Sequence, residues 1–194
     1  KKIQGEVMNV KLVSITQPMV EGELMSAEDI IAYCARVSNP KNQMNTATAP
    51  KLLAFLIKHK HWSPFELANM CVEIKTSRAI AAQILRHRSF SFQEFSQRYA
   101  DPTKDLSFVT REARLQDKKN RQNSIETDDD LLVEEWNNKQ LKLIELAKDT
   151  YKWAIDNGIA KEQARSVLPE GNTVSRMYMN GTQRSWVHYI ELRR

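Results

Sequence analysis

The segment at residues 86–99, RHRSFSFQEFSQRY, gathers anion-seeking side chains. It opens with Arg-His-Arg at residues 86–88, and aromatic residues then alternate with serines. Glu94, Ser96 and Arg98 follow at every second position. Guanidinium groups match the geometry of phosphate oxygens and bind them through paired hydrogen bonds. The segment therefore predicts a binding site for an anionic ligand.

Three side chains in this segment each allow two interpretations. Ser96 could be a nucleophile, but no histidine base is near it in sequence, so a hydrogen bond to a phosphate or base is the safer role. His87 could meet a flat heterocycle as a neutral imidazole, or it could be a surface histidine in a nucleic-acid patch. Glu94 could pair with Arg98 four positions on, or it could orient a substrate amide.

Other familiar catalytic patterns are absent from the sequence. It has no Cys-x-x-Cys or His-Glu-x-x-His motif, no Gly-rich phosphate loop and no Gly-x-Ser-x-Gly elbow, so we expect no metal site and expect side chains to hold the anion. The two cysteines, Cys34 and Cys71, lie in apolar contexts, which favours buried inert thiols and a cytoplasm-like compartment.

Composition is that of a globular protein with an anionic partner. The chain has 194 residues and a net charge of +5, and it contains no apolar run of the roughly 18 residues that a membrane helix needs. Its first ten residues lack the apolar core of a signal peptide. Two classes of function fit the charge: an enzyme acting on a nucleotide, or a non-enzymatic nucleic-acid module in which Phe90, Phe92 and Phe95 stack on bases.

The elements that must position these side chains are helices interspersed with a few strands. We expect strands at residues 9–16, 69–76 and 174–179, with a turn at 180–182. We expect helices at 27–37, capped by Ser26 with Asp29, and at 50–60, 78–88, 131–157 and 183–194, with shorter ones from Ser63 and within 160–168. Residues 101–130 form a polar surface excursion with a helical piece. The predicted fold class is α+β, with helices around a small mixed or antiparallel sheet, in a single domain over residues 1–194.

Apolar stripes predict which helix faces are buried. In the first helix the stripe is Ile30, Ile31, Cys34 and Val37. In the helix at 50–60 the predicted core residues are Leu52, Leu53, Phe55, Leu56 and Ile57. In the helix at 131–157 they are Leu132, Trp136, Leu143, Ile144, Ala147, Tyr151 and Ala154.

In the last helix, Arg184 and Arg193 are nine positions apart and should project to opposite sides.

The opening segment resembles the signature of the flavin-dependent thymidylate synthases: Arg-His-Arg, seven residues, Ser, and Arg two positions later. Four further segments resemble parts of that family in the same order: ARVS at 35–38, HKHWSPFE at 59–66, ARSVLP at 164–169 and NGTQRSWVHYIELR at 180–193. The resemblance covers nearly the whole chain. It departs at Thr182, where the family often has Asn, and the family continues with a further helix where this sequence stops.

The resemblance implies an activity, cofactors and an assembly. The activity is conversion of dUMP to dTMP, with the carbon from methylenetetrahydrofolate and reducing equivalents passed from NADPH through FAD. The assembly is a homotetramer with active sites shared between subunits. The expected location is the cytoplasm, or the host cytoplasm for a viral member, with neither a membrane nor a specific nucleic acid as partner.

The resemblance also assigns site residues. Those implied to bind dUMP are Gln83, Arg86, Glu94, Phe95, Ser96, Gln97, Arg98, Arg165 and Arg193. Those implied to bind FAD are Ser63, Arg86, His87, Arg88, Glu94, Thr182, Gln183, Arg184 and His188. Arg193 is the implied catalytic residue, contacting the uracil and favouring ionisation at N3. A guanidinium is a poor base, but it can stabilise a pyrimidine anion.

Overall fold

The computed structural model describes residues 8–20 and 25–193. Its main sheet has four strands in the order β1-β2-β6-β3. Their bounds are Asn9–Ile15 for β1, Asn69–Ser77 for β2, Ser91–Glu94 for β3 and Val174–Thr182 for β6. With the helices named below, this confirms the predicted mixture of α and β structure.

The residues group into two compact units. Of the described residues, the first unit contains 8–9, 75–86 and 94–176, and the second contains 10–20, 25–74, 87–93 and 177–193. Strands β2, β3 and β6 each contribute residues to both units. The organisation as a single domain over residues 1–194 stays a prediction.

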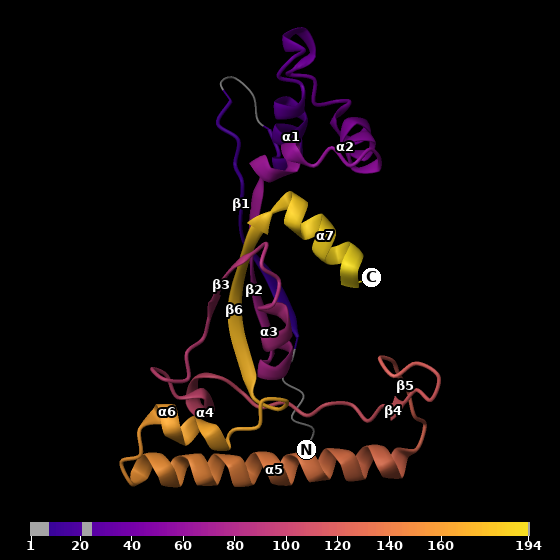
Figure 1. The fold of residues 1–194 in the computed structure, drawn as a ribbon. Coiled ribbons are helices and arrows are strands. Elements are labelled where there is room, and N and C mark those ends of the chain that lie inside the picture. The colour runs from indigo at the N-terminus through magenta and orange to yellow at the C-terminus, as the bar shows by residue number, and fades with distance from the viewer. Residues whose placement is uncertain (1–7, 21–24, 194) are drawn as a thin grey trace. The chain divides into compact units, whose positions relative to one another are not determined.

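The first unit is built on one long helix, α5 (Asp130–Asp156), with α6 (Lys161–Ala164) beside it (Figure 1). Its other helical elements are α3 (Arg78–Ile84), α4 (Pro102–Asp105) and the 3-10 helix η3 (Arg165–Val167). A buried cluster packs α5 and α6 against the segments after α4 and η3; it is made of Phe108, Ile144, Tyr151, Ala154, Ala164 and Leu168.

The ends of α5 follow from its sequence, but the prediction of its buried apolar residues is only partly confirmed. Asp129 caps the start by accepting a hydrogen bond from Leu132 N at 3.0 Å, and Gly158, with φ of 78°, lies just after the end. The predicted core residues Ile144, Ala147, Tyr151 and Ala154 are buried. Leu132, Trp136 and Leu143 are exposed in this chain, so their prediction is wrong. The buried positions follow one row of i, i+3 and i+4 spacings that begins only at Gln140, so Leu132 and Trp136 precede the row and Leu143 lies at its flank.

Residues 101–130 contain the expected helical piece, α4, and also a hairpin that the sequence analysis missed. Strands β4 (Leu115–Gln116) and β5 (Ser124–Ile125) pair antiparallel. The Asp117 carboxylate accepts hydrogen bonds from Lys119 N at 2.8 Å, Asn123 Nδ2 at 2.9 Å and Asn120 N at 3.2 Å. These bonds, led by that from the Lys119 amide, lower the pKa of Asp117. Two-residue strands are too short for a period of two to show in the sequence.

The second unit holds α1 (Ala27–Ala35), α2 (Ala49–Lys58) and α7 (Gln183–Arg193), together with the 3-10 helices η1 (Pro40–Asn42) and η2 (Ser63–Leu67). The predicted capping box is confirmed, since Ser26 and Asp29 bond reciprocally at the start of α1. A core cluster of Ile31, Leu56, Phe65 and Ala68 lies between α1, α2 and η2.

Several local expectations for helix ends and core residues are wrong. Val37 lies beyond α1 and is exposed, and Phe55 on α2 is exposed as well. Ser63 makes no side-chain cap, because it is already inside the 3-10 helix that follows Trp62. Helix α3 stops at Ile84, two residues before Arg86, and residues 180–182 continue β6 rather than forming a turn. In the described residues, no helix combines the length and the apolar character that a membrane span requires.

Candidate active site

The opening segment follows α3 and is divided between the two units. Arg86 closes the first unit's stretch, and its N–H donates to Gln83 O at 3.3 Å. His87 and Arg88 belong to the second unit, and the first unit resumes at Glu94. The predicted nucleotide residues other than Arg193 are thus in the first unit. The predicted flavin residues other than Arg86 and Glu94 are in the second.

Two of the predicted dUMP-binding arginines in the first unit contact the same residue, Glu162. Arg98 Nη2 lies 2.8 Å from Glu162 Oε2, and Arg165 Nε donates to the backbone oxygen of Glu162 at 3.2 Å. Lys161 Nζ, next to Glu162 on α6, donates to Tyr99 O at 3.0 Å. These contacts bring the end of the signature segment to the ARSVLP segment. The sequence analysis missed Glu162, because its carboxylate pairs with Arg98, which is far away in the sequence.

Glu94 is held by residues far away in sequence. Its Oε1 accepts a hydrogen bond from Ser175 Oγ at 2.6 Å and another from Arg78 Nη1 at 3.4 Å. The suggested pairing with Arg98 is wrong, because Arg98 pairs with Glu162 instead. Glu94 ends strand β3 and Arg98 lies beyond it, so no helical turn brings these two residues together.

The neighbours of Glu94 differ in exposure. Phe95 and Ser96 are half-buried, and Gln97 is buried. Ser96 Oγ accepts a hydrogen bond from Arg98 N at 3.4 Å, and no histidine bonds to it in the described part of the chain. This arrangement favours a hydrogen-bonding role for Ser96 over a nucleophilic one.

In the second unit, His87 and Arg193 lie together. Arg193 Nη2 is 3.1 Å from His87 Nε2, and because a guanidinium only donates, Nε2 must be the acceptor. The His87 ring packs edge-on against Tyr189, with ring centroids 4.7 Å apart. The catalytic candidate is therefore oriented by the histidine of the Arg-His-Arg motif.

The start of α7 is tied to the η2 segment that contains Ser63. Arg184 Nη1 bonds to Glu66 Oε1 at 2.9 Å, and Gln183 N donates to Ala68 O at 2.8 Å. The rings of His188 and Trp62 have centroids 4.5 Å apart. Arg184 and Arg193 thus contact different partners, as expected from their opposite projections along α7.

Thr182 has a local structural role at the helix start. Its Oγ1 accepts a hydrogen bond from Ser185 N at 3.3 Å and lies 3.2 Å from Ser185 Oγ. Ser185 Oγ in turn donates to Ser89 O at 3.0 Å. These bonds fix the first turn of α7 beside the signature segment.

Among the predicted site residues that the structure describes, Arg86 and Arg88 are arginines whose side chains remain available to a ligand. Both side chains are exposed, and within residues 8–20 and 25–193 neither forms an ion pair or a side-chain hydrogen bond. The guanidinium groups of Arg78, Arg98, Arg165 and Arg184 have protein partners.

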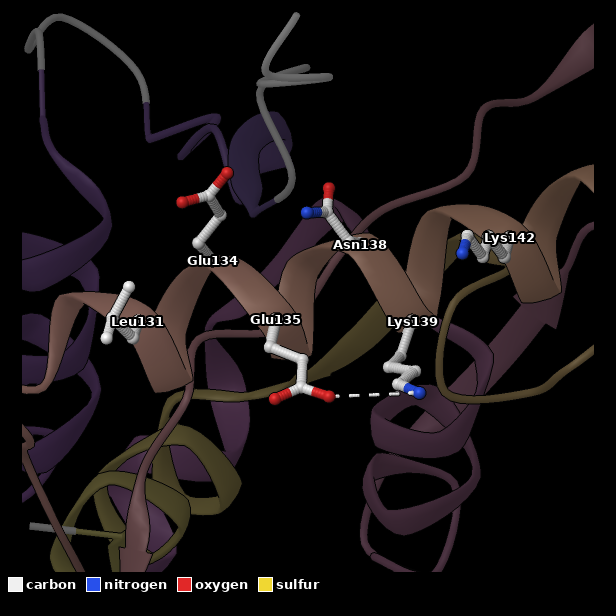
Figure 2. Close-up of a pocket in the computed structure, with 6 residues that line it drawn as sticks. All are labelled: Leu131, Glu134, Glu135, Asn138, Lys139 and Lys142. Atoms are coloured by element: carbon white, nitrogen blue, oxygen red, sulfur yellow. Dashed lines mark ion pairs between the residues drawn. The ribbon is translucent and has the colours of Figure 1, made fainter.

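The surface depressions described in the first unit lie away from the predicted site residues. One of about 410 Å³ runs along a face of α5, where Figure 2 shows the ion pair between Glu135 and Lys139 at 3.8 Å. A second, of about 310 Å³, is lined by Arg111, Trp136, Lys139, Gln140, Leu143, Gly171 and Asn172. Neither depression includes a predicted site residue.

The cysteines are half-buried rather than fully buried. Burial raises the pKa of the Cys34 thiol, which disfavours the thiolate that a nucleophile needs. No cluster of His, Cys, Asp or Glu that could hold a metal ion occurs among the residues placed in the structure.

Comparisons with known proteins identify the family. Residues 22–194 match the model of the thymidylate synthase complementing protein family. The chain is 54% identical over 188 residues to a probable flavin-dependent thymidylate synthase of Paramecium bursaria Chlorella virus 1, covering 96% of this chain and 84% of that protein. It is 50% identical over 188 residues to the flavin-dependent thymidylate synthase of a Synechocystis strain, covering 96% and 85% of the two chains.

A solved structure has the same fold. The UMP/dUMP methylase PolB from Streptomyces cacaoi, bound with 5-Br dUMP, superposes with a TM-score of 0.76 at 24% identity, over 94% of this chain and 76% of that one. The chain belongs to the thymidylate synthase complementing protein family. The resemblance in the sequence is thereby confirmed, and with it the prediction of an enzyme of the flavin-dependent thymidylate synthase type.

Proposed function

We propose that this chain catalyses the reductive methylation of dUMP to dTMP. The carbon donor would be methylenetetrahydrofolate, and NADPH would supply reducing equivalents through FAD. The relatives named above support this activity. The observation that carries it in the structure is that Arg98 contacts the carboxylate of Glu162 and Arg165 its backbone oxygen, because two arginines on neighbouring segments suit a phosphate monoester.

The nucleotide site would combine charge with hydrogen-bond donors. Arg98 and Arg165 would bind the phosphate, helped by the hydroxyl of Ser96 and by Arg86. Gln83, Glu94, Phe95 and Gln97 complete the proposed set. Because the Arg98–Glu162 pair is exposed, a phosphate dianion can replace the carboxylate at little cost.

The residues proposed for FAD fit the chemistry of that group. FAD carries a pyrophosphate and flat rings, and the second unit offers guanidinium, imidazole and hydroxyl groups among aromatic side chains. Arg88 has no protein counterion among the described residues, and the donor set adds Ser63, His87, Gln183, Arg184 and His188, with Thr182 through the helix start. When bound, the flavin supplies the hydride.

Arg193 would act on the pyrimidine by charge. Its contact with His87 orients the guanidinium, and a positive charge beside the uracil stabilises the anion formed when N3 loses its proton. The anion is richer in electrons at the carbon that must attack. The protein would therefore need orientation and charge rather than a nucleophilic cysteine.

We also propose a homotetramer with shared sites. Leu131, Leu146 and Trp153 on α5 are 80%, 65% and 61% exposed in the single chain. Large apolar side chains gathered on one helix mark an interaction surface more often than a surface left in water. A second copy of the chain is the simplest partner.

The first experiment is to purify the chain and record its absorption spectrum. We expect a yellow protein whose flavin band is bleached by NADPH, and which binds dUMP. A colourless protein that takes up neither FAD nor dUMP, yet shifts DNA with strong salt dependence, would instead support the nucleic-acid module.

Replacing Arg193 with lysine tests its role. We expect Arg193→Lys to lower kcat far more than it weakens dUMP binding, since lysine keeps the charge but loses the planar fork. Steady-state kinetics and equilibrium titration with dUMP measure the two effects. Equal losses in both would make Arg193 a binding residue only.

A further inference from the structure

We propose that the C-terminal end of α2, with the residues that follow it, binds the adenosine 2′-phosphate of NADPH. Phe55 is the platform for the adenine, and Lys58 and Lys60 contact the phosphate. The inference rests on the proposed function, because NADPH is the reductant named there. The residue sets proposed for dUMP and FAD include none of these three side chains. Phe55, Lys58, His59, Lys60 and His61 are called the basic edge below.

The net charge of the chain is concentrated in the segment that contains α2. Residues 30–65 include five Lys and Arg residues and no Asp or Glu, so this segment carries a charge of +5. The whole chain also has a net charge of +5, so the rest of the sequence is neutral in sum. A local excess of one sign of charge raises the concentration of the opposite ion near it. An anionic partner is therefore expected at this segment rather than over the whole surface.

The lysines of the basic edge have no partners in the part of the chain that the structure describes. Lys58 and Lys60 are exposed, and neither forms an ion pair or a side-chain hydrogen bond there. They are not needed to satisfy the end of the helix either. Lys60 N donates to Ile57 O at 3.1 Å, and His61 N donates to Leu56 O at 2.8 Å. Because the backbone itself satisfies these carbonyls, the two ammonium groups are left for a ligand.

Lys60 has a backbone conformation that usually belongs to glycine. Its φ is 58°, in the left-handed region, directly after the residue that caps the end of α2. Glycine is the usual residue there, because a Cβ crowds the backbone in this conformation. A lysine at this position therefore costs stability that a glycine would not. Such strain is expected where the side chain has a task.

Phe55 provides an aromatic surface between cations. Its side chain is 51% exposed, and its ring centroid is 4.2 Å from that of His59 and 6.2 Å from that of His61. Lys51 lies four positions before Phe55 and Lys58 three positions after it, so the three residues share one exposed face of α2. Exposed aromatic rings beside cations are typical of sites that stack a base and hold its phosphate.

Charge selects NADPH among the reactants of the proposed reaction. The proposed sites for dUMP and FAD have donor sets of their own. Methylenetetrahydrofolate has no phosphate, and each of its carboxylates carries a single negative charge. The 2′-phosphate of NADPH carries a charge of about −2 at neutral pH and lies beside an adenine. Lysines act as point charges without the planar fork that pairs with a carboxylate, so they favour the phosphate.

The basic edge leads directly into the segment proposed to bind FAD. His61 is followed by Trp62, whose ring centroid is 4.5 Å from that of His188, and then by Ser63. His188 and Ser63 both belong to the proposed FAD set. In NADPH the 2′-phosphate is at the end remote from the nicotinamide. The basic edge would therefore hold one end of the dinucleotide and leave the nicotinamide end free to meet the flavin.

The test measures reduction of the flavin-loaded protein by NADPH and by NADH, and binding of adenosine 2′,5′-bisphosphate by calorimetry. We expect the unaltered protein to prefer NADPH in apparent affinity and to bind the bisphosphate. Lys58→Gln and Lys60→Gly should each lower the preference for NADPH about 5-fold, the upper range for an exposed charge contact. Phe55→Leu should instead weaken both dinucleotides by the same factor, because the adenine is common to them.

Controls separate a lost contact from a damaged fold. Lys60→Gly should raise the melting temperature by about 2–4 °C while it lowers the preference, since glycine relieves the strain at this position. Lys60→Arg keeps the charge and should keep most of the preference. Lys41→Gln removes an equal charge from an exposed residue of the same segment, outside the basic edge, and should leave the preference intact.

Each outcome decides a different point. If Lys41→Gln lowers the preference as much as Lys60→Gly does, net charge is responsible and the basic edge is not a site. If the lysine variants weaken binding of FAD or methylenetetrahydrofolate instead, the assignment to NADPH is wrong. Equal reduction of the unaltered protein by NADPH and NADH, without binding of the bisphosphate, also overturns it. A protein without flavin, or one whose flavin neither dinucleotide reduces, would refute the proposed function itself.

Discussion

The two units hold their candidate side chains by different means. In the first unit, arginines are paired with acids: the pair of Arg98 with Glu162 is exposed, and that of Arg78 with Glu94 is partly buried. In the second unit, the side chains are held mainly by rings: His87 packs on Tyr189 at 4.7 Å between centroids, and Phe90 packs on Trp186 at 4.8 Å.

This difference separates exchangeable contacts from fixed ones. An exposed ion pair contributes only about 0–1 kcal/mol, so a ligand anion can take one partner's place without unfolding anything. A packed ring cannot move without disturbing its neighbours, because protein interiors have few voids. We therefore expect substitutions of the ion pairs to change ligand affinity, and substitutions of packed or buried groups to change stability.

The largest effect is expected at a buried amide network in the first unit. Gln140 on α5 is buried and accepts from Arg111 N at 2.7 Å and from Asn172 Nδ2 at 3.0 Å. It also donates to Arg111 O at 2.9 Å. We expect Gln140→Met to lower the free energy of unfolding by about 2–4 kcal/mol, because several polar groups lose their partners at once.

Chemical denaturation measures this loss, and Asn138→Met on the exposed face of the same helix is the matched control. The control should change stability by less than about 0.5 kcal/mol. If both variants have the same stability, the hydrogen bonds of Gln140 do not contribute to the free energy of unfolding.

The next effect tests the ring packing of the second unit. A Cβ added at Gly181 would meet Phe90 Cδ1 and would lie 2.6 Å from Phe90 Cε1. We expect Gly181→Ala to cost about 1–3 kcal/mol and to lower the melting temperature, because Phe90 must move within a packed cluster. Gly171→Ala in the first unit is the control, since a Cβ there meets nothing within 4 Å. A Gly181→Ala protein that melts like the control would show that the cluster is loosely packed.

Local signals in the sequence were enough to predict where the main helices lie. The Ser26–Asp29 box marks the start of α1, and a long run of helix formers between Asp129 and Gly158 gives α5. Such features depend on residues three or four apart, whose interaction follows from helix geometry. The extent of burial was less predictable, because exposed Leu143 and buried Ile144 have the same apolar character.

The contacts within the site could not be predicted in the same way. Arg78 and Glu94 are 16 positions apart, and Ser175 and Glu94 are 81 apart, so only the sheet brings them together. Motif resemblance supplied the residue types of the site, including His87 and Arg193. It could not supply their partners, since no signal in one sequence reports which acid a given arginine meets.

The smallest effect is expected at the ion pair between Arg98 and Glu162. Glu162→Gln removes the acid that competes with a phosphate for Arg98, so we expect dUMP to bind more tightly by about 1.4- to 5-fold, the range that an exposed ion pair allows. The gain should shrink at high salt, because screening weakens both the pair and its replacement. Equilibrium titration at two ionic strengths measures it. Glu126→Gln is the matched control, since it removes an equal charge from the pair with Arg114 at 3.3 Å in the hairpin and should leave dUMP affinity unchanged. If both variants gain equally, net charge alone is responsible. If Glu162→Gln binds dUMP more weakly, Glu162 positions Arg98 rather than competing for it, and the first unit's ion pairs are as fixed as the rings of the second.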